Sequence, residues 1–348
     1  MTKSHKGSFY VDKADVQKDR DEILRLWQLG FPSANRFEEK YDWFYSNNPA
    51  GKPYLYFLKS GNVNIGVEGI GPKKWLLNGE SIRSGLFVDL IVDPAFRTLG
   101  PALRLIKDST EQSICDVPIL YGFPNPKSLP VYKRGGFELL GMMSRYAKPL
   151  QYTPYILQHS KLLAQSFGRI IDFAYKLTED IINKKLHKSL SCNIDNEFGK
   201  DFDSLWRLRR QDAYCMAQRD KEFLLWRFKN NPLGNYKLFT INSRAAEALL
   251  GYIVFKTDAV GNVAIIDFLA SDNDVNLFGL FRLFGQKMRM AGYKSVSVEF
   301  FGEESVVKIL RQCGFKCRDG QPIISALNSE KLEHKSPKNW YITSADRD

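Results

Sequence analysis

The most informative segment of this 348-residue sequence reads Asp89-Leu90-Ile91-Val92-Asp93-Pro94-Ala95-Phe96-Arg97-Thr98-Leu99-Gly100-Pro101-Ala102. An apolar run before Asp93 predicts a buried strand, and helical spacing from Gly100 to Ser113 predicts a helix directly after the turn. Small side chains at Gly100 and Ala102 let a ligand approach the backbone closely. The unbonded N–H groups of a helix start, together with the helix dipole, favour a negative charge. The segment therefore predicts a pyrophosphate cradle.

A second motif follows this segment. It comprises Tyr121-Gly122-Phe123-Pro124-Asn125, then a predicted short helix over Pro126 to Lys133, which ends at the stop signal Gly135-Gly136. Asn125 lies seven residues before Tyr132, and Tyr132 lies four residues before Gly136. The cradle has neither the G-x-x-x-x-G-K of a P-loop nor the G-x-G-x-x-G of a dinucleotide-binding turn. Both of those phosphate-binding classes are excluded.

The sequence also repeats itself. Trp43 in Y-D-W-F-Y-S-N-N-P-A-G is matched by Trp226 in L-L-W-R-F-K-N-N-P-L-G at an offset of 183 residues, and Gly136-Phe137 is matched by Gly314-Phe315 at an offset of 178. Two anchors in the same order predict a duplicated domain. Chance similarity between short strings is the alternative.

The predicted elements follow the same order in both copies. We expect strands at 54–58, 63–70, 85–92 and 118–121 with helices at 100–113 and 126–133, then strands at 236–241, 248–256, 263–270 and 295–300 with helices at 277–291 and 304–311. The corresponding domains are 1–149 and 191–328, joined by a helical connection over 150–190. Residues 329–348 are expected to form a mobile polar tail.

The order of the motifs in the first copy resembles that of the GCN5-related N-acetyltransferase (GNAT) superfamily. The family pattern V-x-P-x-x-R-x-x-G-x-A, then N, then Y-x-x-x-G-F is matched from Val92 to Phe137, and the resemblance covers residues 20–148. It implies an α/β (α+β) protein of tandem duplicated GNAT folds, each with a mixed, mostly antiparallel sheet flanked by helices. It also implies an acyl-CoA-dependent N-acyltransferase.

The resemblance assigns roles to residues of the first copy. The backbone of Leu90, Ile91 and Val92 would hold the pantetheine arm of coenzyme A, Asn125 would face that arm, and the pyrophosphate would lie on the turn formed by Arg97, Thr98, Leu99, Gly100, Pro101 and Ala102. Tyr132 would lie near the thiol and protonate the leaving thiolate, with a packed aromatic side chain as the alternative. Acyl-CoA is the expected co-substrate, and no metal is expected.

The second copy departs from the family pattern. Aligning Gly279 with Gly100 places Asn276 at the arginine position and Phe281 at the second small position, where a phenyl ring would obstruct the cradle. We therefore expect the second copy to shape the acceptor site or to support the first copy, without binding acyl-CoA.

Further motifs resemble a bacterial branch of the family found in surface-polysaccharide gene clusters. They are Leu26-Trp27 to Phe31-Pro32, W-x-x-x-x-N-P, V-D-P-x-x-R-x-x-G-P-A and Y-G-F-P-N. This resemblance implies that the acceptor is the amine of a nucleotide-linked amino sugar, specifically a dTDP-3-amino-3,6-dideoxyhexose. The alternatives are another amine (an amino acid, an antibiotic or a protein lysine) or a non-catalytic polyanion-binding protein on the same fold.

Four acidic residues and one arginine are candidates at the acceptor site. The attacking amine must lose a proton, and Asp89 is the candidate base because it interrupts an apolar strand that should line the cleft. Asp267 interrupts the matching strand, so a shared structural contact is the alternative for both. Glu68 and Glu299 also lie in strand-like runs, and Arg227 is a candidate for binding an acceptor phosphate.

Composition limits the remaining possibilities. The net charge of +11, from 50 basic and 39 acidic residues, favours polyanionic partners such as coenzyme A and a nucleotide sugar. Scattered cysteines and histidines give no zinc pattern and indicate a reducing, cytoplasmic compartment. No nucleic-acid-binding motif is found, and no apolar run is long enough for insertion into a membrane.

The predicted connection helix, from Tyr155 to Lys188, has an apolar stripe that includes Ile170 and Phe173. An interfacial membrane helix and a helix packed between the domains are the two interpretations. Packing between the domains is favoured because no dense basic face joins the stripe.

Overall fold

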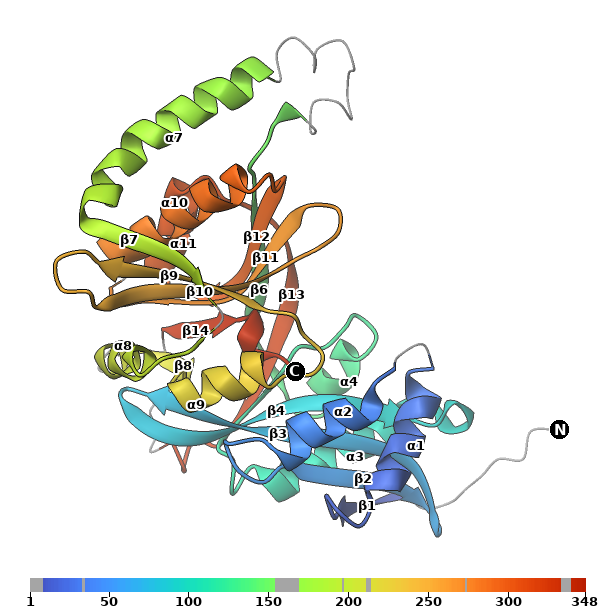
Figure 1. Ribbon diagram of the computed structural model, residues 1–348. Helices are drawn as coiled ribbons and strands as arrows, with labels where there is room; N and C mark the ends of the chain where they lie inside the picture. The colour runs from blue at the N-terminus through green and yellow to red at the C-terminus, as the bar shows by residue number, and fades with distance from the viewer. Residues whose placement is uncertain are drawn as a thin grey trace.

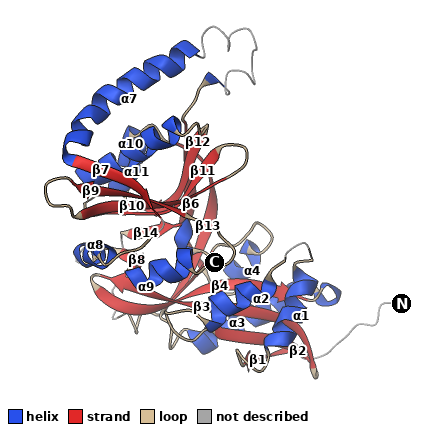
Figure 2. Cartoon of the chain, in the orientation of Figure 1, coloured by secondary structure: helices blue, strands red, loops and turns tan. Residues whose placement is uncertain are grey.

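The computed structural model describes residues 9–32, 35–153, 169–195, 197–210, 214–272, 274–332 and 339–348. All the strands within these ranges belong to one sheet, whose main order is β1-β2-β3-β4-β5-β13-β6-β12-β11-β10-β9-β7. The helices pack against this sheet in two groups, one for each half of the chain (Figures 1 and 2).

The first half contains the strands β1 (Phe9–Ala14), β2 (Tyr54–Ser60), β3 (Val63–Leu77), β4 (Glu80–Val92), β5 (Ile119–Gly122) and β6 (Glu138–Pro149). Its helical elements are α1 (Arg20–Gly30), α2 (Phe37–Tyr41), η1 (Asp42–Ser46), η2 (Pro94–Phe96), α3 (Leu99–Ser113) and α4 (Leu129–Arg134). The helix after the cradle and the short helix before Gly135 therefore lie where the sequence predicts them.

The second half repeats this order after helix α7 (Arg169–Ser189). Its strands are β7 (Leu190–Asp195), β8 (Cys215–Ala217), β9 (Lys237–Ser243), β10 (Leu249–Thr257), β11 (Asn262–Ala270), β12 (Ser295–Gly302), β13 (Lys316–Leu327) and β14 (Trp340–Thr343). Its remaining helical elements are α8 (Asp201–Arg209), α9 (Lys221–Leu224), η4 (Leu225–Lys229), α10 (Val275–Met290), α11 (Glu304–Gln312) and η5 (Ser344–Asp346).

Strands β6 and β13 join the two halves. β13 lies between β5 and β6, while β6 lies between β13 and β12, and all three of these pairings are antiparallel. Figure 1 shows both strands running from one half to the other. Each half therefore completes its sheet with a strand from the other half, which the sequence pattern does not reveal.

The repeated tryptophans meet at the contact between the halves. The rings of Trp43 and Trp226 stack with their centroids 5.0 Å apart. Each indole N–H donates to the backbone carbonyl of the other tryptophan, at 2.8 Å for Trp43 and 3.0 Å for Trp226. This reciprocal pair shows that the repeated W-x-x-x-x-N-P segments are part of the scaffold.

The expectation of a mobile polar tail over 329–348 is wrong for its last part. β14 pairs with β12 and β8, and the side chain of Asp346 is fully buried. The Asp346 carboxylate accepts hydrogen bonds from Arg219 Nη2 at 2.8 Å and from the Thr343 backbone N–H at 2.8 Å. Polar residues are buried here because their partners lie in distant parts of the chain, which a local polarity pattern does not show.

The part of the predicted connection helix that the structure describes carries its apolar stripe on the surface, and not between the domains as expected. Residues 154–168 lie outside the described ranges, but α7 shows Ile170 and Phe173 exposed to solvent by 63% and 62%. The favoured interpretation, packing between the domains, is therefore wrong for these two side chains. Within the described ranges, no helix is both long and apolar enough to cross a membrane.

Candidate functional site

The site begins where β4 and β5 diverge. These two strands pair in parallel only over Ser84–Phe87 and Ile119–Gly122. From Val88 onward, β4 pairs with β3 alone among the described strands, and its register shifts opposite Glu68. Asp89 sits in this β-bulge with a φ of 55°, an unusual value for a non-glycine residue. The bulge accompanies the divergence and leaves an opening between the two strands.

A cavity of about 520 Å³ occupies this opening. Both halves of the chain contribute to its wall. The first half supplies residues of α1, α2, β4, β5 and α4, and the second half supplies Leu233, Gln321, Arg347 and Asp348. Tyr132, Asp89, Leu90 and Asn125, four of the residues predicted at a site, all line this cavity.

The predicted cradle lies at the start of α3. Thr98 is the extended N-cap residue, the helix begins at Leu99, and no side chain caps it. A Cβ built on Gly100 would meet no atom within 4 Å, so the space beside the backbone is open. Arg97 folds back, and its Nε donates to the Val92 carbonyl at 2.9 Å, which fixes the turn. This uncapped helix start fits an anionic group such as a pyrophosphate.

The corresponding helix start in the second half is closed. Asp272 Oδ1 accepts from the backbone N–H groups of Asp274 and Asn276, both at 3.0 Å, so a carboxylate occupies the position that an anion would need. Counted from the helix starts, Asn276 and not Gly279 corresponds to Gly100. Phe281 is fully buried and packs edge-to-face against Phe268, so it belongs to the core.

The strand opening of the second half is also occupied by protein. β11 and β12 pair in parallel over Asn262–Ile265 and Ser295–Val298. Beyond that point β14 pairs with β12, through Phe300 and Thr343 and the two residue pairs that follow. An extended segment of the chain itself thus lies where the first half is open.

Tyr132 and Glu68 form a buried pair beside the cavity. The Tyr132 hydroxyl donates to Glu68 Oε1 at 3.0 Å, and Ser109 Oγ donates to Glu68 Oε2 at 2.9 Å. Burial raises the pKa of Glu68 to about 8, although the two hydrogen bonds oppose this shift. Burial and the neighbouring Glu68 also raise the pKa of Tyr132 well above its usual value. Glu68 is therefore mostly a neutral acid at pH 7.

Two carboxylates and a lysine also line the cavity. Lys40 Nζ donates to Asp89 Oδ1 at 2.7 Å and to Asp348 Oδ2 at 2.8 Å, and the Tyr45 hydroxyl donates to Asp89 Oδ2 at 2.7 Å. The side chain of Asp89 is only 5% exposed, whereas that of Asp348 is 41% exposed. Both oxygens of Asp89 are thus occupied, and Asp348 is the more exposed of the two carboxylates that line the cavity.

The charges of this group depend on burial and on Lys40. Burial raises the pKa of Asp89, and the Lys40 ammonium opposes the shift. Burial also acts to raise the pKa of Asp348, but Lys40 and Arg227 together act against it, and this pKa lies below its usual range. Asp348 is consequently an ionised carboxylate at neutral pH.

Other predicted site residues have structural partners. Asp267 is fully buried and accepts from Arg219, Tyr252 and Thr343. Asp89 and Asp267 thus each accept hydrogen bonds from one cationic side chain and one tyrosine hydroxyl. This is the shared structural contact that was the alternative to a catalytic role for both residues. Glu299 Oε2 accepts from Ser344 Oγ and from Arg347 Nη1, at 2.7 and 2.8 Å. Neither Asp267 nor Glu299 lines the large cavity.

The remaining predicted residues lie around the cavity or behind it. Arg227 is buried, and its guanidinium donates to the backbone carbonyls of Ala345, Arg347 and Asp348. It therefore holds the segment that carries Asp348. Ile91 and Val92 are buried on β4, and Asn125 Oδ1 accepts from the N–H groups of Lys127 and Ser128. No local sequence pattern marked Lys40 or Asp348 as site residues, because the two side chains that meet are 308 positions apart in the sequence.

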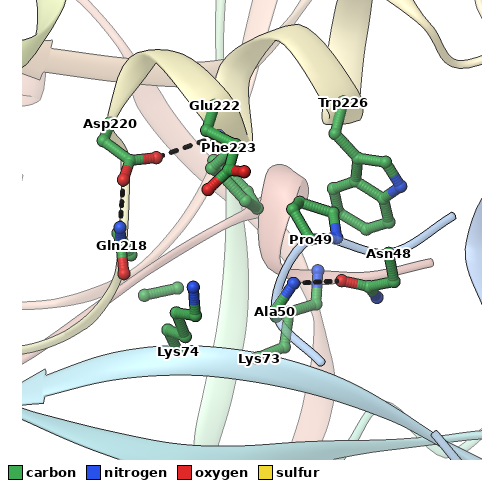
Figure 3. Close-up of a pocket in the computed structure, with 11 residues that line it drawn as sticks. Asn48, Pro49, Ala50, Lys73, Lys74, Gln218, Asp220, Glu222, Phe223 and Trp226 are labelled. Atoms are coloured by element: carbon green, nitrogen blue, oxygen red, sulfur yellow. Dashed lines mark hydrogen bonds between the residues drawn. The ribbon is translucent and has the colours of Figure 1, made fainter. Parts of the chain in front are cut away.

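A second, much smaller pocket lies at the contact between the halves (Figure 3). Its volume of about 20 Å³ has room for roughly one water molecule. Lys73 is fully buried there, with Nζ 5.3 Å from the ring centroid of Trp226, and no described residue accepts a hydrogen bond from it. Burial, reinforced by Arg227, lowers the pKa of Lys73 to about 7. This pocket is too small for an acyl acceptor.

Substitution of Glu68 tests whether burial raises the pKa of its carboxyl group. Its pKa is about 8 in the folded chain against 4.5 for an unperturbed carboxyl, so the unfolded chain binds fewer protons between these values. The wild type should therefore lose stability relative to Glu68→Gln as the pH rises from 5 to 8. The slope should reach about 1.4 kcal/mol per pH unit at most, measured by urea unfolding. Glu138→Gln is the control for the loss of one exposed carboxyl. If the unfolding free energy of Glu68→Gln changed with pH in parallel with that of the wild type, the raised pKa of Glu68 would be contradicted.

Comparisons with known proteins agree with this geometry. No protein-family model and no curated protein sequence matches the chain. Among solved structures, a GCN5-related N-acetyltransferase from Anabaena variabilis has a TM-score of 0.62 at 15% identity, covering 92% of this chain and 73% of its own. A tandem GNAT protein from the clavulanic acid biosynthesis pathway has a TM-score of 0.53 at 12% identity, covering 95% of this chain and 100% of its own.

An N-myristoyltransferase from Saccharomyces cerevisiae, solved with bound myristoyl-CoA, has a TM-score of 0.54 at 13% identity and covers 91% of this chain and 82% of its own. At such low identities the likeness concerns the fold. The fold class expected from the duplicated motifs is confirmed: the chain has a tandem GNAT fold, in which two copies share one mixed sheet.

Proposed function

We propose that this protein is an acyl-CoA-dependent N-acyltransferase whose acyl-CoA site lies in the first copy. We further propose that its acceptor is the amine of a nucleotide-linked amino sugar, with a dTDP-3-amino-3,6-dideoxyhexose as the specific candidate. One observation carries the proposal: the first copy has both an uncapped helix start and a 520 Å³ cavity where β4 and β5 diverge, while protein groups occupy both corresponding places in the second copy.

The residues of the first copy fit coenzyme A, which would supply the thioester. The N–H groups at the start of α3 and the open space at Gly100 suit its pyrophosphate. The free edge of β4 beyond Phe87 offers backbone groups to the pantetheine amides, as a neighbouring strand would. Asn125 and Leu90 line the same cavity as Tyr132, where the pantetheine arm would lie.

Asp348 is the group of this chain that would receive the acceptor amine. It is ionised and lines the cavity, so it attracts and orients an ammonium group, and it accepts a proton from the nitrogen once the bond to the carbonyl carbon has made that nitrogen strongly acidic. Asp89 supports this role indirectly, because it holds Lys40 against Asp348. We therefore replace Asp89 by Asp348 as the candidate base, and keep Asp89 as a positioning residue.

Tyr132 would return a proton to the leaving sulfur. Its hydroxyl now donates to Glu68, but a neutral Glu68 carries a proton of its own and can donate that proton to the Tyr132 oxygen instead. The tyrosine proton then becomes available to the cavity. In the balanced reaction, the ammonium group loses its first proton to water, the nitrogen–carbonyl bond forms and the carbon–sulfur bond breaks. Asp348 gains the second proton of the nitrogen, the thiolate gains a proton from Tyr132, and Glu68 gives its proton to the Tyr132 oxygen.

The nucleotide-sugar part of the proposal is supported by the motif resemblance and by the charge of the chain. A nucleotide diphosphate is a polyanion, and a chain with a net charge of +11 attracts it. A screen of dTDP- and UDP-linked amino sugars against amino acids and a lysine peptide, with acetyl-CoA as donor, identifies the acceptor class.

Acetyl-CoA binding tests the proposed function. Calorimetry with the wild type should give a micromolar Kd, and the double variant Arg97→Glu, Gly100→Trp should raise Kd beyond about 1 mM, because it places a carboxylate and an indole in the cradle. Val275→Trp puts the same side chain at an exposed position on the first turn of α10 and should bind as the wild type does. Absence of binding by the wild type at 1 mM would reject the acyltransferase proposal.

Substitution of Tyr132 tests the proton donor. Tyr132→Phe keeps the ring that packs on Phe87 and Phe137 but removes the hydroxyl. We expect kcat to fall by about 10²- to 10⁴-fold, with acetyl-CoA affinity unchanged, in a thiol-release assay with the acceptor found by the screen. Tyr10→Phe removes an exposed tyrosine hydroxyl as the control. Retention of more than half of kcat would show that Tyr132 only packs.

A further inference from the structure

Helix α7 is amphipathic with its polar side turned inward. Its 21 residues run along the outer side of α10 (Figure 1). A helix on the surface of a water-soluble domain normally buries its apolar side. The reversal in α7 needs a physical explanation, because exposed apolar stripes mark interaction surfaces.

Polar contacts hold the inner side of α7. Glu179 is 1% exposed and lies 3.2 Å from Arg289 Nη2, with Arg282 and Lys148 each 3.8 Å away. Asn183 is fully buried and accepts from Arg282 Nε at 3.2 Å. These contacts fix which side of the helix faces α10, so the orientation follows from buried polar groups that must remain paired.

The outer side of α7 is apolar over most of its length. Ile170, Phe173, Leu177 and Ile181 are 63, 62, 47 and 72% exposed. Their spacing of three and four residues places them on one face. Lys184 and Lys188 continue the same face toward the end of the helix, and both are exposed. We name this face, Ile170 to Lys188, the outer stripe.

Most of the described charged side chains beside the outer stripe are positive. Lys176 and Lys185 are exposed, as are Lys184 and Lys188 within the stripe. Of the described acidic side chains of α7, Glu179 is buried. Asp180 is 43% exposed, but it accepts from Gln286 and lies 3.6 Å from Arg289 Nη2, both on α10. An occupant of the stripe must therefore offer both an apolar layer and negative charge.

We propose that the outer stripe binds the surface of an anionic lipid bilayer, with α7 lying parallel to it. The apolar side chains would enter the boundary between headgroups and acyl chains, and the lysines would remain among the phosphates. This surface lies in the second half, apart from the cavity, and the proposal is independent of the enzymatic one. It would hold an enzyme of this fold beside substrates made at a membrane.

A second copy of the chain fits the stripe less well. Parallel pairing of two α7 helices would bring the lysines together, and antiparallel pairing would place them against Ile170 and Phe173 of the other copy. Neither arrangement gives the lysines an acidic partner among the described side chains. Charge complementarity therefore favours lipid over self-association.

Vesicle co-sedimentation of the full chain tests the proposal. We expect binding to vesicles of 70% phosphatidylcholine and 30% phosphatidylserine, and binding at least about tenfold weaker to pure phosphatidylcholine. Phe173→Ser with Ile181→Ser should weaken binding at least about tenfold, and Lys184→Gln with Lys188→Gln should weaken it about fivefold for each lysine. Val63→Ser with Val260→Ser removes two exposed apolar side chains elsewhere and is the matched control.

Folding and self-association are measured on the same samples. All variants change exposed positions and should keep the circular dichroism spectrum and the acetyl-CoA affinity of the wild type, whatever that affinity is. Absence of binding to the anionic vesicles, or equal binding by the Phe173→Ser, Ile181→Ser variant, would overturn the proposal. Dimerisation in light scattering that this variant abolishes, without lipid binding, would likewise overturn it in favour of a second copy.

Discussion

The antiparallel pairing of β6 with β13 is the interaction on which the rest of the structure depends. Each strand belongs to one half by sequence but completes the sheet of the other. This exchange brings Gln321 of β13 to the cavity wall. The chain then continues through β14 and η5, which lie against β12 and carry Arg347 and Asp348 back to the cavity of the first half. The candidate site is therefore incomplete without the second copy, although protein groups occupy the helix start and the strand opening of that copy.

The two copies share a backbone plan but differ in what occupies their openings. In the second copy, β14 pairs with β12, and the Asp272 carboxylate caps the start of α10. A buried network of Arg219, Asp267 and Asp346 fastens that segment. In the first, the helix start is uncapped, and Lys40 connects Asp89 to a carboxylate that faces the cavity. A buried charge without a partner of opposite sign is costly. Asp89 on β4 therefore has Lys40 beside it, and Asp267 on β11 has Arg219 beside it.

Local sequence patterns predicted the local parts of the structure well. The strand–turn–helix of residues 89–102 and the glycine stop after Tyr132 are set by neighbouring residues, and the repeated tryptophans revealed the duplication. The strand exchange, the burial of residues 340–346 and the outward stripe of α7 were missed. Each depends on a partner far away in the sequence, such as Lys40 for Asp348 or α10 for Glu179, and no local periodicity records such a contact.

Hydrogen–deuterium exchange with and without coenzyme A tests the central claim, that the first copy alone provides the acyl-CoA site, most directly. The ligand should slow exchange of backbone amides in residues 88–102, because the free edge of β4 and the start of α3 would gain hydrogen-bond partners. The matching residues 266–276 of the second copy should exchange equally with and without the ligand. Protection of 266–276, or protection of neither segment at saturating coenzyme A, would contradict the account.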